Sequence, residues 1–148
     1  RSRRRKSLRR RGINVATQLS LNFWDYEFSC KCGCGAFNVD PRLVSILQRV
    51  RDKSKALVIT SGVRCEKHNK EVGGAPRSWH IPRGSNGYAS DFTYADGSRS
   101  PSAILKLYAL ADQAGAVGLG LYHGRVHIDV REGKRARWVD SSWDWKKD

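Results

Sequence analysis

Histidine and aspartate residues that could bind a metal ion stand close together in two segments of the chain. His127 and Asp129 lie two positions apart in VHIDV, and His80 precedes Asp91 in SWHIPRGSNGYASDF. Residues two apart on a strand point to the same face, so we expect His127 and Asp129 to project together. Two imidazoles and one carboxylate fit a catalytic zinc site, in which three protein ligands leave the fourth position to water. The pattern predicts hydrolytic zinc chemistry.

Each of these residues also has a purely structural interpretation. A single histidine near a strand end is commonly a hydrogen-bonded structural residue. Asp91 is harder to explain in this way, because an unpaired carboxylate is costly to bury in an otherwise apolar strand and a nearby cation would remove that cost. Composition and spacing alone leave both interpretations open.

Two longer helices are indicated by their first residues and by the spacing of their apolar side chains. Asp40 is a good N-cap for a helix over residues 41–52, which begins with proline. Ser100 is the equivalent start of a helix over residues 101–114. The expected face of this second helix consists of Ile104, Leu105, Tyr108 and either Ala111 or Asp112.

The remaining segments predict a small sheet. A short helix is expected at residues 66–72, a Pro- and Gly-containing loop at 75–88, and a last strand within the Trp-rich end. The other strands are expected at residues 56–60, 89–94, 117–123 and 125–130. This element order predicts an α+β domain with a small, mainly antiparallel sheet flanked by helices.

The basic charge of the chain is concentrated at its N-terminus. Arginine and lysine residues between Arg1 and Arg11 supply +8 of the formal net charge of +14, and no acid interrupts them. Such a block repels itself and buries no apolar surface, so we expect a disordered tail that attracts nucleic acid, anionic lipid or anionic cell-wall polymer. A solubilising or linker segment of a longer precursor is the alternative. We divide the chain into a basic tail at 1–20, a domain at 21–140 and a C-terminal tail at 141–148.

No segment of the sequence predicts a helix that spans a membrane. A membrane-spanning helix needs about 18 or more consecutive apolar residues, and the chain has no such run. The basic N-terminus is not followed by an apolar stretch and a small-residue cleavage site, so it does not resemble a secretory signal.

The four cysteines leave the redox state of the chain open. Cys30, Cys32 and Cys34 form a Cys-x-Cys-x-Cys run, and Cys65 stands apart from it. The run lacks the two-residue gap of a zinc knuckle, so a tetrahedral site made of all four cysteines is not the favoured interpretation. Disulfides that tie the run to Cys65 and free thiols are equally compatible with the spacing.

The ordered series ITSGVRCEKHNKEVGGAPRSWH, GYASDF and VHIDV resembles the zinc D-alanyl-D-alanine carboxypeptidases and the related peptidoglycan L-alanyl-D-glutamate endopeptidases of phage lysins. The resemblance extends over residues 23–130 and implies the fold that this family shares with the hedgehog signalling domain. It implies His80, Asp91 and His127 as the ligands of one zinc ion. It further implies that Arg64 and Ser78 contact the substrate, with Arg64 near the scissile bond.

Two features depart from the pattern of this family. Ten residues separate His80 from Asp91, where the family more often has six, so the loop between them looks like an insertion. Many relatives place a Glu, Asp or His three residues before the last ligand, and Gly124 stands there instead. The expected general bases are Asp129, ranked first, and His123, although Asp129 could equally orient a ligand.

The resemblance implies a zinc metallopeptidase, either a carboxypeptidase or an endopeptidase, that hydrolyses peptidoglycan stem peptides or cross-links at the bacterial cell wall. A phage or bacterial source and a role in lysis or wall remodelling are expected with it. The first alternative is a zinc-stabilised binding module without catalysis, which the glycine at position 124 favours. The second is a virion component that binds nucleic acid or another polyanion through the basic tail and the tryptophans. Those tryptophans are Trp24, Trp79, Trp138, Trp143 and Trp145.

Overall fold

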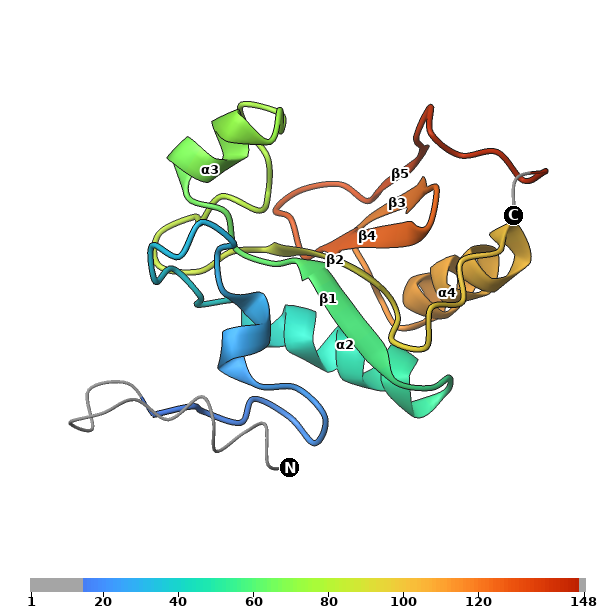
Figure 1. The fold of residues 1–148 in the computed structure, drawn as a ribbon, viewed down its shortest axis with the longest axis horizontal. Coiled ribbons are helices and arrows are strands. Elements are labelled where there is room, and N and C mark those ends of the chain that lie inside the picture. Colours follow the sequence, from blue (N-terminus) through green and yellow to red (C-terminus); the bar gives the residue numbers. More distant parts are fainter. Residues whose placement is uncertain (1–14, 147–148) are drawn as a thin grey trace.

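The structure, a computed structural model, describes residues 15–146 and contains one five-stranded sheet flanked by helices (Figure 1). The sheet has the order β1-β2-β4-β3-β5, in which neighbouring strands are antiparallel except for the parallel pair of β3 and β5. In chain order the elements are η2 (Asp25–Phe28), α2 (Pro41–Asp52), β1 (Leu57–Ser61), α3 (Glu66–Glu71), β2 (Ala89–Tyr94), α4 (Pro101–Gln113), β3 (Gly118–Tyr122), β4 (Arg125–Asp129) and β5 (Ala136–Val139). The predicted α+β class with a mainly antiparallel sheet is confirmed.

Helices α2 and α4 begin where the sequence predicts them. The Asp40 carboxylate accepts a hydrogen bond from the backbone N–H of Arg42, and the Ser100 hydroxyl accepts one from that of Ala103. These caps satisfy N–H groups that have no partner inside the helix. The predicted face of α4 is wrong at Leu105, which is 49% exposed. The face that meets the core consists of Ile104, Leu107 and Ala111.

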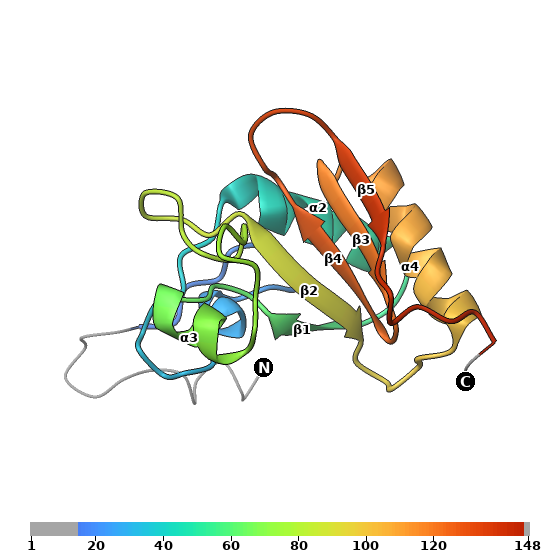
Figure 2. The same cartoon turned by 90° about the horizontal axis from the view of Figure 1, so that it is seen from above.

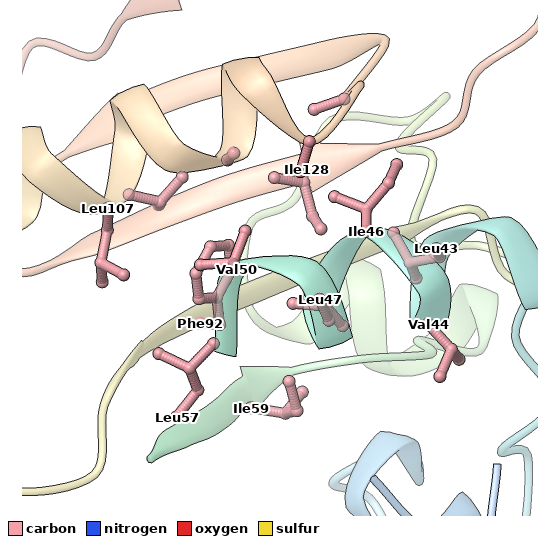
Figure 3. Close-up of a cluster of buried hydrophobic side chains, with 14 of the residues drawn as sticks. Leu43, Val44, Ile46, Leu47, Val50, Leu57, Ile59, Phe92, Leu107 and Ile128 are labelled. Atoms are coloured by element: carbon pink, nitrogen blue, oxygen red, sulfur yellow. The ribbon is translucent and has the colours of Figure 1, made fainter. Parts of the chain in front are cut away.

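Both long helices pack on one face of the sheet, whereas α3 lies on the other side of it (Figures 1 and 2). The core fills the space between these helices and the sheet. Figure 3 shows side chains of α2, such as Leu47 and Val50, together with Ile59, Phe92 and Ile128 from three strands. Burying one such side chain stabilises the fold by about 1.5–3 kcal/mol. The helices therefore fix the sheet from one side and leave its other face for the polar residues.

That second face carries the polar residues that could bind a metal ion. Phe92 and Ile128 point into the core, and side chains alternate along a strand, so Asp91, His127 and Asp129 point away from α2 and α4. Asp91 and His127 are register partners across β2 and β4. The loop over residues 75–88, which is irregular as predicted, brings the chain back to this face before β2.

An N-terminal strap, residues 15–40, runs across the domain before α2 begins. Its side chains Phe23 and Phe28 are buried in the core. The carbonyl of Phe28 accepts a hydrogen bond of 2.9 Å from the N–H of Val63, which follows β1. Farther upstream, the hydroxyl of Ser20 donates to Gln48 on α2 at 2.7 Å. The strap is thus attached to the domain at several points along its length.

The predicted domain limits stay predictions. Of the basic tail placed at 1–20, residues 1–14 lie outside the part of the chain that the structure describes, while residues 17–20 belong to the strap and hydrogen-bond to its later residues and to α2. At the other end, Trp143 packs against the core although it falls within the predicted C-terminal tail. Within residues 15–146, no helix has the length and apolar character needed to cross a membrane.

Candidate metal centre

His80, Asp91 and His127 come together on the face of the sheet opposite the long helices. All three are buried, and their ligand atoms lie within 4.8 Å of one another. The His127 Nδ1 atom is 2.9 Å from Asp91 Oδ1, and the His80 Nε2 atom is 3.3 Å from the same oxygen. The cross-strand register places Asp91 opposite His127, and the loop before β2 supplies His80.

The backbone fixes the ring of His80. Its Nδ1 atom lies 2.7 Å from the carbonyl oxygen of Gly62, and because a carbonyl oxygen only accepts, Nδ1 carries the hydrogen. The backbone N–H of His80 donates to the hydroxyl of Ser78, and its carbonyl accepts from the N–H of Arg64. The Nε2 atom therefore presents a lone pair to Asp91.

Asp129 fixes the ring of His127 in the equivalent way. The Asp129 carboxylate is completely buried and lies 2.8 Å from His127 Nε2. The same carboxylate accepts hydrogen bonds from the backbone N–H, Nε and Nη2 of Arg131, at 3.0, 2.9 and 2.8 Å. An ionised carboxylate only accepts, so His127 carries its hydrogen on Nε2 and also presents a lone pair, at Nδ1, to Asp91.

Glycines of β3 make room for these side chains. Gly118 is the register partner of Asp129, and a Cβ atom at this position would collide with the Asp129 carboxylate oxygens. Gly120 is the register partner of both His127 and Trp138, and a Cβ atom there would collide with the Trp138 indole. The indole instead packs against the His127 ring at a centroid distance of 5.2 Å.

This donor set fits a zinc ion. Two imidazole lone pairs face one carboxylate oxygen, so three electron-pair donors meet at one point. Such an arrangement needs a cation between the three atoms, either a proton or a metal ion. Two ligands about 2.0 Å from a tetrahedral zinc are about 3.3 Å apart, which is close to the separations of 2.9 and 3.3 Å around Asp91 Oδ1. A buried cation would also compensate the buried carboxylate.

Nearby charges favour the ionised form of Asp91. Burial raises the pKa of this carboxyl group, but when protons in place of a metal ion lie between Asp91 and the imidazoles, the resulting charge of His80 and the hydrogen bonds from both imidazoles outweigh burial and hold the pKa well below its ordinary value. Two guanidinium groups add to this effect, because Arg64 Nη2 and Arg125 Nε each lie 3.6 Å from Asp91 Oδ2. Asp91 is therefore a carboxylate at neutral pH, as a metal ligand must be.

Arg64 is held at the edge of the centre by its own contacts. Its Nε atom donates to the hydroxyl of Ser61 at 3.1 Å, and Nη1 donates to the side-chain oxygen of Asn69 at 3.0 Å. Asn69 is buried and donates in turn to the carbonyl of Ala75. Burial lowers the pKa of Arg64, although the charge of Asp91 opposes this shift. The guanidinium is thus fixed in place beside the proposed ligands.

A cavity of about 1020 Å³ opens over the centre. His80, Asp91, His127, Arg64 and Ser78 all line it. Its basic lining residues are Lys31, Arg64, Arg77, Arg125 and Arg131. Among the described residues, the carboxylates that line it are Asp91 and Asp140. The cavity is therefore strongly cationic around a buried anionic centre.

Neither of the two residues expected to act as a general base lines the cavity. His123 is exposed on the turn between β3 and β4 and does not line the cavity. Asp129 is buried beneath His127 and does not line the cavity either. The cavity wall also includes Asp140, which the sequence did not single out and which follows β5 directly, with its backbone N–H donating to the carbonyl of Leu121. Asp140 reaches the cavity because β5 pairs in parallel with β3, and no local sequence pattern predicts that pairing.

Comparison with known protein families places the chain in a peptidase family. The model of the family described as Peptidase M15 matches residues 21–129, which is most of the chain. The matched segment includes all three clustered ligand candidates together with Arg64 and Asp129. The search of the curated proteins gave no match.

Proposed function

Because the chain belongs to the peptidase M15 family, we propose that it is a zinc metallopeptidase that hydrolyses peptide bonds in peptidoglycan. The observation that carries this proposal is the buried group of His80, Asp91 and His127 at the wall of a cationic cavity. These three residues would hold one zinc ion. A zinc ion bound by three protein ligands supplies a water molecule of lowered pKa and polarises the carbonyl of a scissile amide.

The chemistry of the cavity supports a substrate with carboxylate groups. Five basic side chains line it, and the only carboxylate on its wall outside the proposed ligands, among the described residues, is Asp140. Peptidoglycan stem peptides carry free carboxylates, which guanidinium groups bind through paired hydrogen bonds. Arg64 is oriented by Ser61 and Asn69 and has further N–H groups to donate. It binds a substrate carboxylate or the developing oxyanion.

We assign Asp129 to positioning and not to proton transfer. Its two oxygens are occupied by His127 and Arg131, and it is shielded from the cavity. Such a carboxylate holds the imidazole ring and its tautomer in place. From the sequence, Asp129 ranks first as the general base. We instead propose the alternative, in which Asp129 orients a ligand.

Asp140 is our candidate for the group that accepts the proton of the attacking water. Hydrogen bonds from Ser142 hold the pKa of the Asp140 carboxyl below its ordinary value, so it is ionised at neutral pH. Arg125 connects it electrostatically to the centre, because Arg125 contributes to that pKa shift and also lies beside Asp91. A carboxylate on the cavity wall can take a proton and return it to the leaving amine.

We further propose that the protein acts at the bacterial cell wall, in lysis or wall remodelling and as a phage or bacterial product. The basic residues between Arg1 and Arg11, which lie outside the described part of the chain, would add attraction to anionic wall polymers.

The proposal is tested by incubating the zinc-loaded protein with purified peptidoglycan and identifying the products by mass spectrometry. Free D-alanine would identify a carboxypeptidase, and shortened stem peptides or opened cross-links would identify an endopeptidase. A zinc-loaded protein that releases neither, yet still binds peptidoglycan, would contradict the proposal and indicate a binding module.

A further inference from the structure

A second group of metal-ligand residues lies outside the centre described above. Cys30, Cys32 and Cys34 belong to the N-terminal strap, and Cys65 stands directly before α3. Their four sulfur atoms lie within 4.8 Å of one another. In both views of the fold, the segment between η2 and α2 passes beside the start of α3 (Figures 1 and 2). The fold therefore brings together thiols that are more than thirty positions apart in the sequence.

The separations between the sulfur atoms are those of a metal site and not of disulfides. All four cysteines are free, and the Sγ atoms are 3.4 Å apart for Cys30 and Cys32, 3.7 Å for Cys32 and Cys65, and 3.9 Å for Cys30 and Cys65. A disulfide needs sulfur atoms about 2.05 Å apart. Thiolates about 2.3 Å from a tetrahedral zinc ion are about 3.8 Å apart. The three separations lie around that value.

The backbone of the strap is folded so that alternate cysteines converge. On an extended strand, residues two apart are separated by about 6.6 Å, so Cys30 and Cys32 would not be in contact. Here Gly33 and Gly35 have positive φ angles of 84° and 92°, a region that favours glycine. The loop closes through a hydrogen bond of 2.7 Å from the N–H of Cys30 to the carbonyl of Ala36.

Backbone N–H groups also point at two of the sulfur atoms. The N–H of Cys65 donates to Cys30 Sγ at 3.5 Å, and the N–H of His68 donates to Cys65 Sγ at 3.3 Å. Such bonds orient thiolate ligands and partly compensate their charge, as partners of metal ligands commonly do. The site thus has the supporting hydrogen bonds as well as the ligands.

We propose that Cys30, Cys32, Cys34 and Cys65 bind a second zinc ion in a closed tetrahedral site. Each thiol gives its proton to solvent as it coordinates, and the zinc ion does not change its oxidation state. With four protein ligands no position is left for water, so the role of this zinc is structural.

The cysteine site adjoins the segment that contacts His80 and carries Arg64. Cys65 follows Arg64 directly, and Gly62, three positions before Cys65, accepts the hydrogen bond from His80. A Cβ atom at Gly62 would collide with the backbone of Phe28, so the strap already lies against this segment. A zinc ion between Cys65 and the strap therefore fastens the segment that holds His80 and Arg64.

Elemental analysis of zinc and iron in the wild type and four variants tests the proposal. The wild type is expected to contain two zinc ions per chain, His127→Ala one, the double variant Cys32→Ser/Cys34→Ser one, and the combined variant none. Cys34→His, which keeps a zinc ligand at the same position, is expected to retain two. A wild-type chain with a single zinc that is lost in His127→Ala and kept in the cysteine double variant would overturn the proposal, as would iron in place of the second zinc.

Two further readouts keep the test independent of peptidase activity, and the second also makes it independent of the folding of the variants. Cobalt-substituted His127→Ala is expected to show the charge-transfer absorption of thiolate-bound cobalt, and its absence would contradict the proposal. In the wild type, modification of the thiols by a mercurial is expected to release one zinc ion and leave the other bound. A mass that shows disulfides in the purified protein, with no zinc released, would overturn the assignment. Loss of the histidine-bound zinc alone would contradict the proposed peptidase and not this site.

Discussion

Asp91 on β2 and His127 on β4 are register partners in the sheet, and their side chains meet with Asp91 Oδ1 2.9 Å from His127 Nδ1. The hydrogen-bond ladder between the two strands therefore sets the geometry of the proposed metal centre. His80 completes it from a loop, but its ring is fixed by the carbonyl of Gly62 beside β1. Strands β2 and β4 and the loop that carries His80 thus position the three proposed ligands without a helix.

Asp129→Asn tests the role of Asp129 in positioning His127. The amide side chain lacks the charge that holds both the His127 ring and Arg131, so zinc affinity is expected to fall about 10- to 100-fold. Competition with a chelator of known affinity measures this change. Unchanged zinc affinity together with loss of hydrolysis would instead make Asp129 the proton acceptor.

Asp140→Asn tests the proposed proton acceptor. The substitution removes the basic oxygen from the cavity wall but touches no proposed ligand, so turnover is expected to fall about 100-fold or more with zinc content unchanged. Asp144→Asn is the matched control, because Asp144 is exposed and does not line the cavity. Full activity in Asp140→Asn would remove this residue from the mechanism.

Gly118→Ala tests whether the space beside Asp129 is needed. The added Cβ atom would collide with the Asp129 carboxylate, so the free energy of unfolding is expected to fall by about 1–3 kcal/mol. Urea denaturation measures this loss. In a double-mutant cycle with Asp129→Ala, which removes the colliding oxygens, the cost of Gly118→Ala is expected to shrink. Equal costs in both backgrounds would show that the two residues are not coupled.

Arg64→Lys tests the proposed contact with the substrate. A lysine keeps the charge but cannot reproduce the separate hydrogen bonds to Ser61 and Asn69 that orient the guanidinium. We expect kcat/KM to fall about 100-fold while zinc content stays the same. Arg42→Lys is the control, because the Arg42 side chain is exposed and does not line the cavity. An Arg64→Lys protein with normal kcat/KM would leave Arg64 with a structural role only.

Much of the fold was predictable because its signals are local. The Asp40 cap and the apolar spacing after it predicted α2, and the alternation in VHIDV predicted that His127 and Asp129 share a face of β4. The position of Leu105 was predicted wrongly, because two overlapping apolar stripes fit α4 and only packing on the sheet selects the one with Leu107.

The parts that were missed depend on contacts between distant segments. Asp140 and Trp138 reach the cavity only because β5 pairs with β3 in parallel, and four residues of strand carry too little pattern to reveal a partner. The spacing of the cysteines does not favour a zinc site made of all four, and the proposal of such a site depends on the fold, which brings Cys65 beside the run. His123 stood next to the site in sequence, yet the turn directs it to solvent.

The most direct test of the proposed function is the release of new amino groups from purified peptidoglycan, measured with zinc content for the wild type and His127→Ala. We predict zinc-dependent release by the wild type, and in His127→Ala the loss of both this activity and one zinc ion per chain. Release that is unaffected by His127→Ala, or a His127→Ala protein with the same zinc content as the wild type, would contradict the metal centre proposed here.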